Sequence, residues 1–223
     1  MIITPKLDHE HNREYALRIV RDNIINLEIK PGSLIGEQEI ATMLNLSRTP
    51  VHEAFLELSK SKIINILPQK GCLVSYIDLE LINEARFLRR CVESALIEEA
   101  CDIATPEDIA ELDENIRLQE FYMSNSAKFM ELDNNFHKTL YRICNKMQCH
   151  YMVTLMSMHF DRVRNLTLQE NRDDKIIKDH KGILEAIKNK DKQTGVETFI
   201  KHINRFNLDW EHIASKYDEY IAK

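Results

Sequence analysis

The stretch that decides the fold of this chain runs from residue 31 to residue 74 and reads PGSLIGEQEIATMLNLSRTPVHEAFLELSKSKIINILPQKGCLV. Its first half predicts two short helices separated by a sharp turn. The first helix opens after Gly36 with acidic residues that suit the positive end of the helix dipole, and it ends at Asn45. Its expected inward side chains are Ile40, Ala41, Met43 and Leu44.

The second helix of the pair begins after Ser47, a good N-cap residue, and runs to about Lys60. Pro50 falls in its first turn, where a missing backbone N–H costs no hydrogen bond. Apolar residues recur at the i, i+3, i+4, i+7 spacing of one helix face, namely Val51, Ala54, Phe55 and Leu58. At the N-terminal end of this helix, the side chains that point outward are Arg48, Thr49, His52 and Glu53. This is the end with which a recognition helix contacts base edges.

A β-hairpin is expected after the second helix. Residues 63–67 have the composition of a strand, residues 68–71 form a turn tipped by Lys70, and the chain returns through residues 73–76. Residues 1–76 are therefore predicted to form a winged helix-turn-helix domain that binds DNA, the alternative being a small α+β module without a nucleic-acid role. An upstream helical stripe would complete a three-helix core: Tyr15, Leu17, Ile19, Val20, Ile24 and Leu27.

These motifs resemble the N-terminal domain of the GntR superfamily of bacterial transcription regulators, whose pattern is approximately PG, E-x-E-L-A, S-R-T-P-V-R-E-A-L and G-x-x-V. The matching segments are, in order, Pro31-Gly32, Glu37 to Ala41, Ser47 to Val51, Glu53 to Phe55 and Gly71 to Val74. His52 departs from the pattern, because the family usually has an arginine there as a phosphate or guanine contact. The resemblance implies that the DNA-binding residues are Gln38, Ser47, Arg48, Thr49, His52, Lys70 and Gly71.

Length and composition agree with such a regulator. The chain has 223 residues and 43% apolar content, which is enough for one or two cores. It has no run of about 20 apolar residues and no apolar N-terminal stretch, so we expect a cytoplasmic protein without a membrane span or signal peptide. The five cysteines form no C-x-x-C pair, which predicts reduced thiols that act as small buried hydrophobes: Cys72, Cys91, Cys101, Cys144 and Cys149.

The net charge of −6 has the wrong sign for a nucleic-acid binder. The acidity lies in the second part, because residues 1–76 contain nine basic and nine acidic residues, whereas the remainder contains 21 basic and 27 acidic ones. DNA affinity is therefore expected to come from helix N-termini, from doubling the site in a homodimer, and from a local basic patch. That patch would contain Lys30, Arg48, Lys60, Lys62 and Lys70.

From Asp78 onward the sequence shows no strand alternation and divides into helical blocks with short connections. The blocks span residues 79–101, 107–124, 127–145, 150–170, 174–188 and 191–217. The junction is expected at residues 75–78, where the strand pattern stops. The predicted fold class is therefore mainly α, with an all-α bundle over residues 77–223 that can enclose a cavity.

Two paired spacings bring metal-ligating residue types together in this bundle. Asp133 and His137 are i and i+4 on one helix and share a face. His180 and His202 lie on consecutive helices, each about eleven residues from the turn at 190–191, so an antiparallel hairpin places both imidazoles at one height. A lone histidine is more often a surface or core residue than a ligand, but three imidazoles and one carboxylate suit a divalent ion. We expect zinc, with nickel or manganese as alternatives.

The second part is also similar to the FCD ligand-sensing domain of the FadR branch of this superfamily. Residues 132–137, LDNNFH, resemble its D-x-x-F-H motif, and Asn145 matches an asparagine after it. Residues 179–184, DHKGIL, resemble its E-H-x-x-I-L motif, and His202 follows at the expected interval. In metal-containing members these four positions hold the ion, and a small organic acid completes its shell. The resemblance thus implies the ligands Asp133, His137, His180 and His202.

The same resemblance implies an effector contact at Arg86, which lies in the first bundle helix at the position of the family's E-V-R motif. An arginine there faces the cavity and can clamp the carboxylate of the effector through two parallel hydrogen bonds. The alternative is that Arg86 is a solvated helix arginine, like its neighbours Arg89 and Arg90.

Three functions are compatible with these patterns. The favoured one is a transcription regulator, not an enzyme, that binds operator DNA as a homodimer and senses a small carboxylate through its metal. The second is a metal-dependent hydrolase, which is disfavoured because no H-E-x-x-H arrangement supplies a general base. The third is a DNA-binding protein in which the metal only holds the bundle together.

Overall fold

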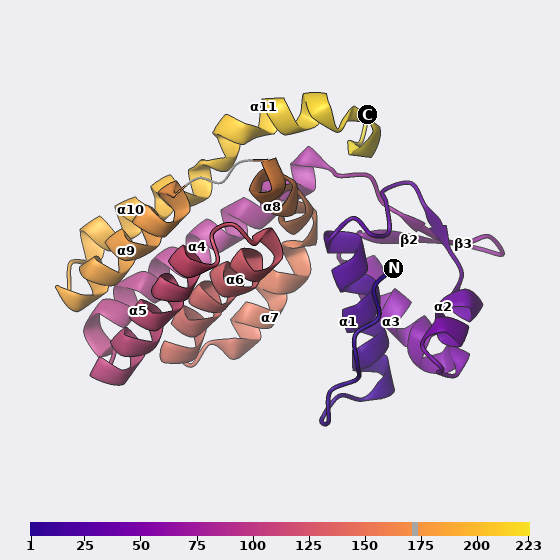
Figure 1. Ribbon diagram of the computed structural model, residues 1–223, viewed down its shortest axis with the longest axis horizontal. Coiled ribbons are helices and arrows are strands. Elements are labelled where there is room, and N and C mark those ends of the chain that lie inside the picture. Colours follow the sequence, from indigo (N-terminus) through magenta and orange to yellow (C-terminus); the bar gives the residue numbers. More distant parts are fainter. Residues whose placement is uncertain (171–173) are drawn as a thin grey trace.

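The computed structural model describes residues 1–170 and 174–223, and within these ranges the chain is mainly helical with one small sheet (Figure 1). The strands β1 (Leu34–Ile35), β2 (Ile64–Leu67) and β3 (Gly71–Val74) form an antiparallel sheet in the order β1-β3-β2, in which Leu34 pairs with Leu73 and Ile64 pairs with Val74. This winged module consists of α1 (Asn12–Ile25), β1 (Leu34–Ile35), α2 (Glu37–Met43), α3 (Arg48–Lys60), β2 (Ile64–Leu67) and β3 (Gly71–Val74). The predicted winged helix-turn-helix is confirmed, with β1 as an additional strand.

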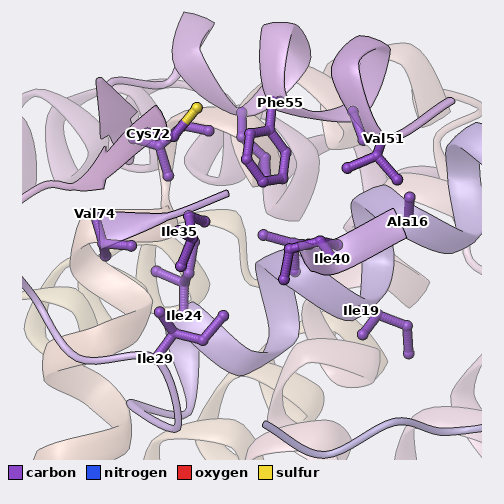
Figure 2. Packing of buried hydrophobic residues seen from close by; sticks show 14 of the residues in the cluster. Ala16, Ile19, Ile24, Ile29, Ile35, Ile40, Val51, Phe55, Cys72 and Val74 are labelled. Atoms are coloured by element: carbon purple, nitrogen blue, oxygen red, sulfur yellow. The ribbon is translucent and has the colours of Figure 1, made fainter. Parts of the chain in front are cut away.

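The core of the winged module lies between the inner faces of its three helices and the sheet (Figure 2). On α3 the side chains at the predicted spacing, Val51, Ala54, Phe55 and Leu58, are all fully buried. Burial of a large apolar side chain stabilises a domain by about 1.5–3 kcal/mol, so this face fixes α3 in the module. The opposite face of α3 remains exposed to solvent.

Two side chains of the module differ from the expectation. Met43 is 44% exposed, because at about 100° per residue it lies off the arc of α2 that Ile40 and Leu44 bury. Tyr76 is exposed and lies beyond β3, which ends at Val74. The wing is therefore shorter than predicted.

The rest of the chain is an all-α bundle, as predicted (Figure 1). Its helices are α4 (Leu79–Ile103), α5 (Pro106–Phe121), α6 (Ser126–Ile143), α7 (Met147–Met156), α8 (Met158–Glu170), α9 (Lys175–Lys188), α10 (Lys192–Asn204) and α11 (Phe206–Lys216), followed by a 3₁₀ turn (Asp218–Tyr220). Two of the predicted blocks are each interrupted, the fourth at Ser157 and the sixth at Arg205. The core of the bundle is formed mainly by α4, α5, α6, α9 and α10.

The linker between the two parts is held by α8. Arg162 is fully buried and donates hydrogen bonds to the carbonyl oxygens of Ser75 (2.6 Å) and Tyr76 (3.2 Å). The linker also pairs with the end of the chain, because the Ile77 N–H donates to the Tyr220 carbonyl oxygen at 2.7 Å. The path of the linker is therefore fixed by the bundle on two sides.

A second contact from α8 reaches the winged module itself. The imidazole of His159 lies between the two parts, with Nε2 3.2 Å from the Lys62 carbonyl oxygen and Nδ1 3.3 Å from the Asp78 backbone nitrogen, which donates to it. Burial lowers the pKa of His159 to about 3, so the ring is neutral. Met158 packs into the core of the winged module. Helix α8 thus belongs to the bundle and also contacts the winged module.

The cysteines differ in part from the expectation of uniform burial. All five are free thiols; Cys72, Cys101 and Cys144 are buried, but Cys91 and Cys149 are exposed. Cys91 lies on the face of α4 opposite the buried one, and Cys149 lies near the start of the largely exposed α7. Within the described ranges, the helices are too short or too polar to cross a membrane.

Candidate metal centre and DNA-contacting face

Four side chains from three helices converge inside the bundle. Asp133 and His137 lie one turn apart on α6, while His180 comes from α9 and His202 from α10, which pack against each other as an antiparallel pair. One potential ligand atom from each of the four lies within 4.8 Å of the others. The structure thus brings together all four residues that the sequence predicted as metal ligands.

Each of the three imidazoles has an oxygen atom beside its Nδ1. The Nδ1 of His180 is 2.8 Å from Oε1 of the fully buried Gln119, and the Nδ1 of His137 is 2.7 Å from Oε2 of Glu93. The Nδ1 of His202 is 3.8 Å from an Asp179 oxygen. The contact of His180 is a hydrogen bond, whereas the Nδ1 atoms of His137 and His202 have no hydrogen-bond partner within the described residues. The acceptor at Nδ1 of His180 favours the tautomer that carries its proton there and leaves the lone pair on Nε2, the arrangement found around metal-bound histidines.

The chemistry of this donor set fits a divalent transition metal. Burial lowers the pKa of His180, which keeps its ring neutral. Burial by itself would raise the pKa of the Asp133 carboxyl. Arg164 and the three histidines together lower this pKa by a larger amount, so it lies below the ordinary value. Among the described residues, the buried Nε2 atoms of His137 and His180 have no hydrogen-bond partner. One carboxylate and three imidazoles suit zinc or nickel.

Two cavities adjoin the four-residue cluster. A small one of about 70 Å³ is lined by Asp133 and His202, and a larger one of about 540 Å³ is lined by His137. The larger cavity extends to the winged module, because Arg21 and Asn26 of that module form part of its wall. A volume of this size is within the range of small-molecule sites.

The structure corrects the expected environment of two arginines. Arg86 lines neither of these two cavities; its guanidinium lies 3.3 Å from the Ile203 carbonyl oxygen and 3.2 Å from the Asn204 side-chain oxygen. Arg89, expected to be solvated, is 5% exposed, pairs with Glu93 at 2.7 Å and lines both cavities. Because the two arginines are three residues apart on α4, the rotation of the helix decides which one faces the site.

Sequence reasoning missed the residues that surround the four predicted ligands. Glu93 and Arg89 carried a signal, because they are i and i+4 and form a pair on one helix face. Asp179 carried another, because an acid directly precedes His180. Gln119 and Arg164 had no signal of this kind, since they reach the cluster from α5 and α8 by tertiary packing.

The residues predicted to contact DNA lie on exposed positions of α2, α3 and the wing. Gln38, Ser47, Arg48, Thr49, His52 and Lys70 are exposed, and Gly71 is half-buried at the base of the wing. Gly71 has a φ of +98°, and a Cβ there would lie 2.9 Å from the Ile35 carbonyl oxygen, so only glycine fits. Ser47 precedes α3 as predicted, but its side chain makes no capping hydrogen bond.

Comparison with protein families decides the relationship. The model for the FCD domain matches residues 84–205, more than half of the chain, and the model for bacterial regulatory proteins of the gntR family matches residues 13–74. The chain belongs to the GntR family. It is a DNA-binding transcription regulator of this family with an FCD ligand-binding domain.

Individual relatives of this GntR-family regulator agree with that assignment. The transcriptional repressor RspR of Escherichia coli K12 is 25% identical over 209 residues, which is 92% of each chain. The transcriptional regulator McbR of the same organism is 24% identical over 202 residues, which is 86% of each chain. The solved structure of E. coli McbR/YncC superposes with a TM-score of 0.76 at 20% identity and covers 94% of this chain and 99% of that one, which shows a shared fold.

Proposed function

We propose that this GntR-family regulator senses a small organic acid through a divalent metal held by Asp133, His137, His180 and His202. The DNA-binding domain would comprise residues 1–76 and the sensing domain residues 77–223, and the protein would act on operator DNA in the bacterial cytoplasm. The single observation that carries the proposal is the largely buried convergence of three imidazoles and one carboxylate beside a cavity. Zinc is the proposed ion, with nickel and manganese as alternatives.

The residues around the cluster fit recognition of a carboxylate. A bound metal would supply a Lewis acid for one carboxylate oxygen. Arg89 and Arg164 line both cavities and present cations beside the cluster, so they are the proposed partners of the acid. Arg86 remains a weaker candidate, because its guanidinium is directed to the backbone of α10.

Helix α8 supports a path from the sensing site to the DNA. Arg164 pairs with Asp133 in the cluster, while Arg162 and His159 on the same helix hold the linker and the Lys62 carbonyl oxygen. A ligand that moves Arg164 therefore acts on the helix that positions the winged module. The effector changes DNA affinity only to the extent that it binds the two arrangements differently.

A homodimer is part of the proposal. One winged module contains as many acidic as basic residues and covers one half-site, so a two-fold related pair is needed for specificity. Two-fold symmetric dimers are also the commonest oligomers.

The test compares His180→Ala with His212→Ala, a matched loss of an exposed histidine outside the cluster. Metal content is measured by mass spectrometry, and DNA affinity is measured with and without acetate, succinate and citrate. His180→Ala should lose the metal and the response to acids together and retain most DNA binding without effector, whereas His212→Ala should behave like the wild type. A metal-free His180→Ala protein with a normal response would make the ion structural, and metal-dependent hydrolysis of model esters would favour an enzyme.

A further inference from the structure

Two side chains at the start of the recognition helix, Arg48 and His52, share one carboxylate. Glu37, the first residue of α2, is 11% exposed, and its Oε2 accepts a hydrogen bond from the Arg48 Nε at 2.8 Å. Its Oε1 lies 2.7 Å from the Nδ1 of His52. We propose that Glu37 is a positioning residue for base recognition, which holds Arg48 and His52 together in the geometry that reads DNA.

The contact leaves the useful end of Arg48 available. Glu37 accepts from Nε of a side chain that is 68% exposed, so the two terminal nitrogens Nη1 and Nη2 are the ones left for DNA. These two nitrogens are the pair with which arginine binds O6 and N7 of guanine. An arginine tethered at Nε loses less side-chain freedom on binding DNA, so its recognition contributes more to the affinity.

The Glu37 carboxylate also contacts His52, the histidine at the position where the family usually has an arginine. His52 follows Arg48 by one turn on the same face of α3, and its side chain is 49% exposed. With Nδ1 directed to Glu37, the Nε2 atom is the one left to face DNA. Glu37 therefore sets which nitrogen of His52 can contact a base or phosphate.

The charge of Glu37 gives this role a measurable signature. Burial by itself would raise the pKa of the Glu37 carboxyl. The hydrogen bonds from His52 and Arg48 together lower this pKa by a larger amount, so it lies below the ordinary value. A carboxylate on this face repels DNA phosphates and so weakens sequence-independent binding. Its removal should therefore raise non-specific affinity while lowering specific affinity, a pair of changes that a merely structural residue would not produce.

Glu39 provides a matched control. It lies in the same first turn of α2 and carries the same charge, but it is exposed. Both Glu37→Gln and Glu39→Gln remove one negative charge with little change in shape. The two variants thus differ in the contact with Arg48 and His52.

The probes are a 30-base-pair duplex selected from a randomised library by the wild-type protein and an alternating inosine-cytosine polymer. Glu37→Gln should bind the selected duplex about tenfold more weakly, within the range for one bidentate base contact. It should bind the polymer as well as or better than the wild type. Glu39→Gln should change both affinities in the same direction, so their ratio stays constant.

A double-mutant cycle tests whether Glu37 acts through its two partners. In the Arg48→Ala/His52→Ala background, Glu37→Gln should produce no further loss of specificity. The proposal is overturned if Glu37→Gln leaves the specific-to-non-specific ratio unchanged, or if the ratio falls equally in that background. It is also overturned if both affinities fall in parallel with the melting temperature, because Glu37 would then only stabilise the fold.

Discussion

Replacement of Gln119 with leucine is expected to weaken metal binding without altering any of the four proposed ligands. Gln119 is fully buried, its Oε1 lies 2.8 Å from Nδ1 of His180, and its Nε2 donates to the Asn115 side-chain oxygen at 2.7 Å. Leucine has a similar volume but no acceptor. The proton on Nδ1 of His180 would lose its partner, and the ring could place that proton on Nε2, the nitrogen needed for the ion.

The size of the effect follows from the number of orienting contacts. Loss of an orienting hydrogen bond to a metal-bound histidine costs about 10- to 100-fold in metal affinity. The other three proposed ligands keep their present contacts, including the 2.7 Å approach of Glu93 Oε2 to Nδ1 of His137, so the lower half of this range applies. We therefore expect zinc to bind about 10- to 30-fold more weakly, which is about 1.4–2 kcal/mol.

Zinc affinity can be measured by competition with a chromophoric chelator, with circular dichroism to confirm that the variant is folded. Gln119→Glu is the control, because its carboxylate keeps an acceptor for Nδ1 of His180 and should retain tight binding. A folded Gln119→Leu protein with wild-type zinc affinity would refute the reasoning. In that case the contact between Gln119 and His180 would not orient a ligand.

Three further predictions concern the winged module, the assembly and the connection between them. Arg48→Ala should weaken binding to the selected duplex by about 1–3 kcal/mol in a mobility-shift titration, because it removes the proposed base contact; an unchanged affinity would contradict this role. Sedimentation of the free and DNA-bound protein should give a homodimer, and a monomer in both states would exclude the assembly. Arg162→Met removes the two hydrogen bonds that Arg162 donates to the linker, so it should keep the metal but reduce the effect of an acid on DNA affinity by about fivefold or more. Equal responses in wild type and Arg162→Met would show that the coupling does not pass through this side chain.

The sequence by itself determined the features that depend on local periodicity. The apolar spacing of Val51, Ala54, Phe55 and Leu58 fixed the buried face of α3, and burial of all four followed. The i, i+4 spacing of Asp133 and His137 also specified a shared face, because 3.6 residues make one turn of a helix. Such patterns are readable because the geometry of one helix depends on its own residues.

Tertiary structure decided the features that depend on the relative rotation and pairing of distant elements. The sequence favoured Arg86 over Arg89 as the effector contact, although both lie on one side of α4. The packing of α8 and α10 instead directs Arg86 to the backbone of α10 and places Arg89 on the wall of a cavity. The two-residue strand β1 has too little sequence to predict, and it exists because Leu34 and Ile35 pair with β3.

The orientation of the imidazoles was likewise decided by packing. Gln119 contacts a residue 61 positions away, and Glu93 contacts one on another helix, so neither contact has a fixed sequence spacing. The same holds for the shared contact of Glu37 with Arg48 and His52, which forms only when α2 and α3 pack across their turn. Local periodicity therefore predicted the shared face of Asp133 and His137 and the outward positions at the start of α3, whereas the three-dimensional packing of helices selected the side chains that contact them.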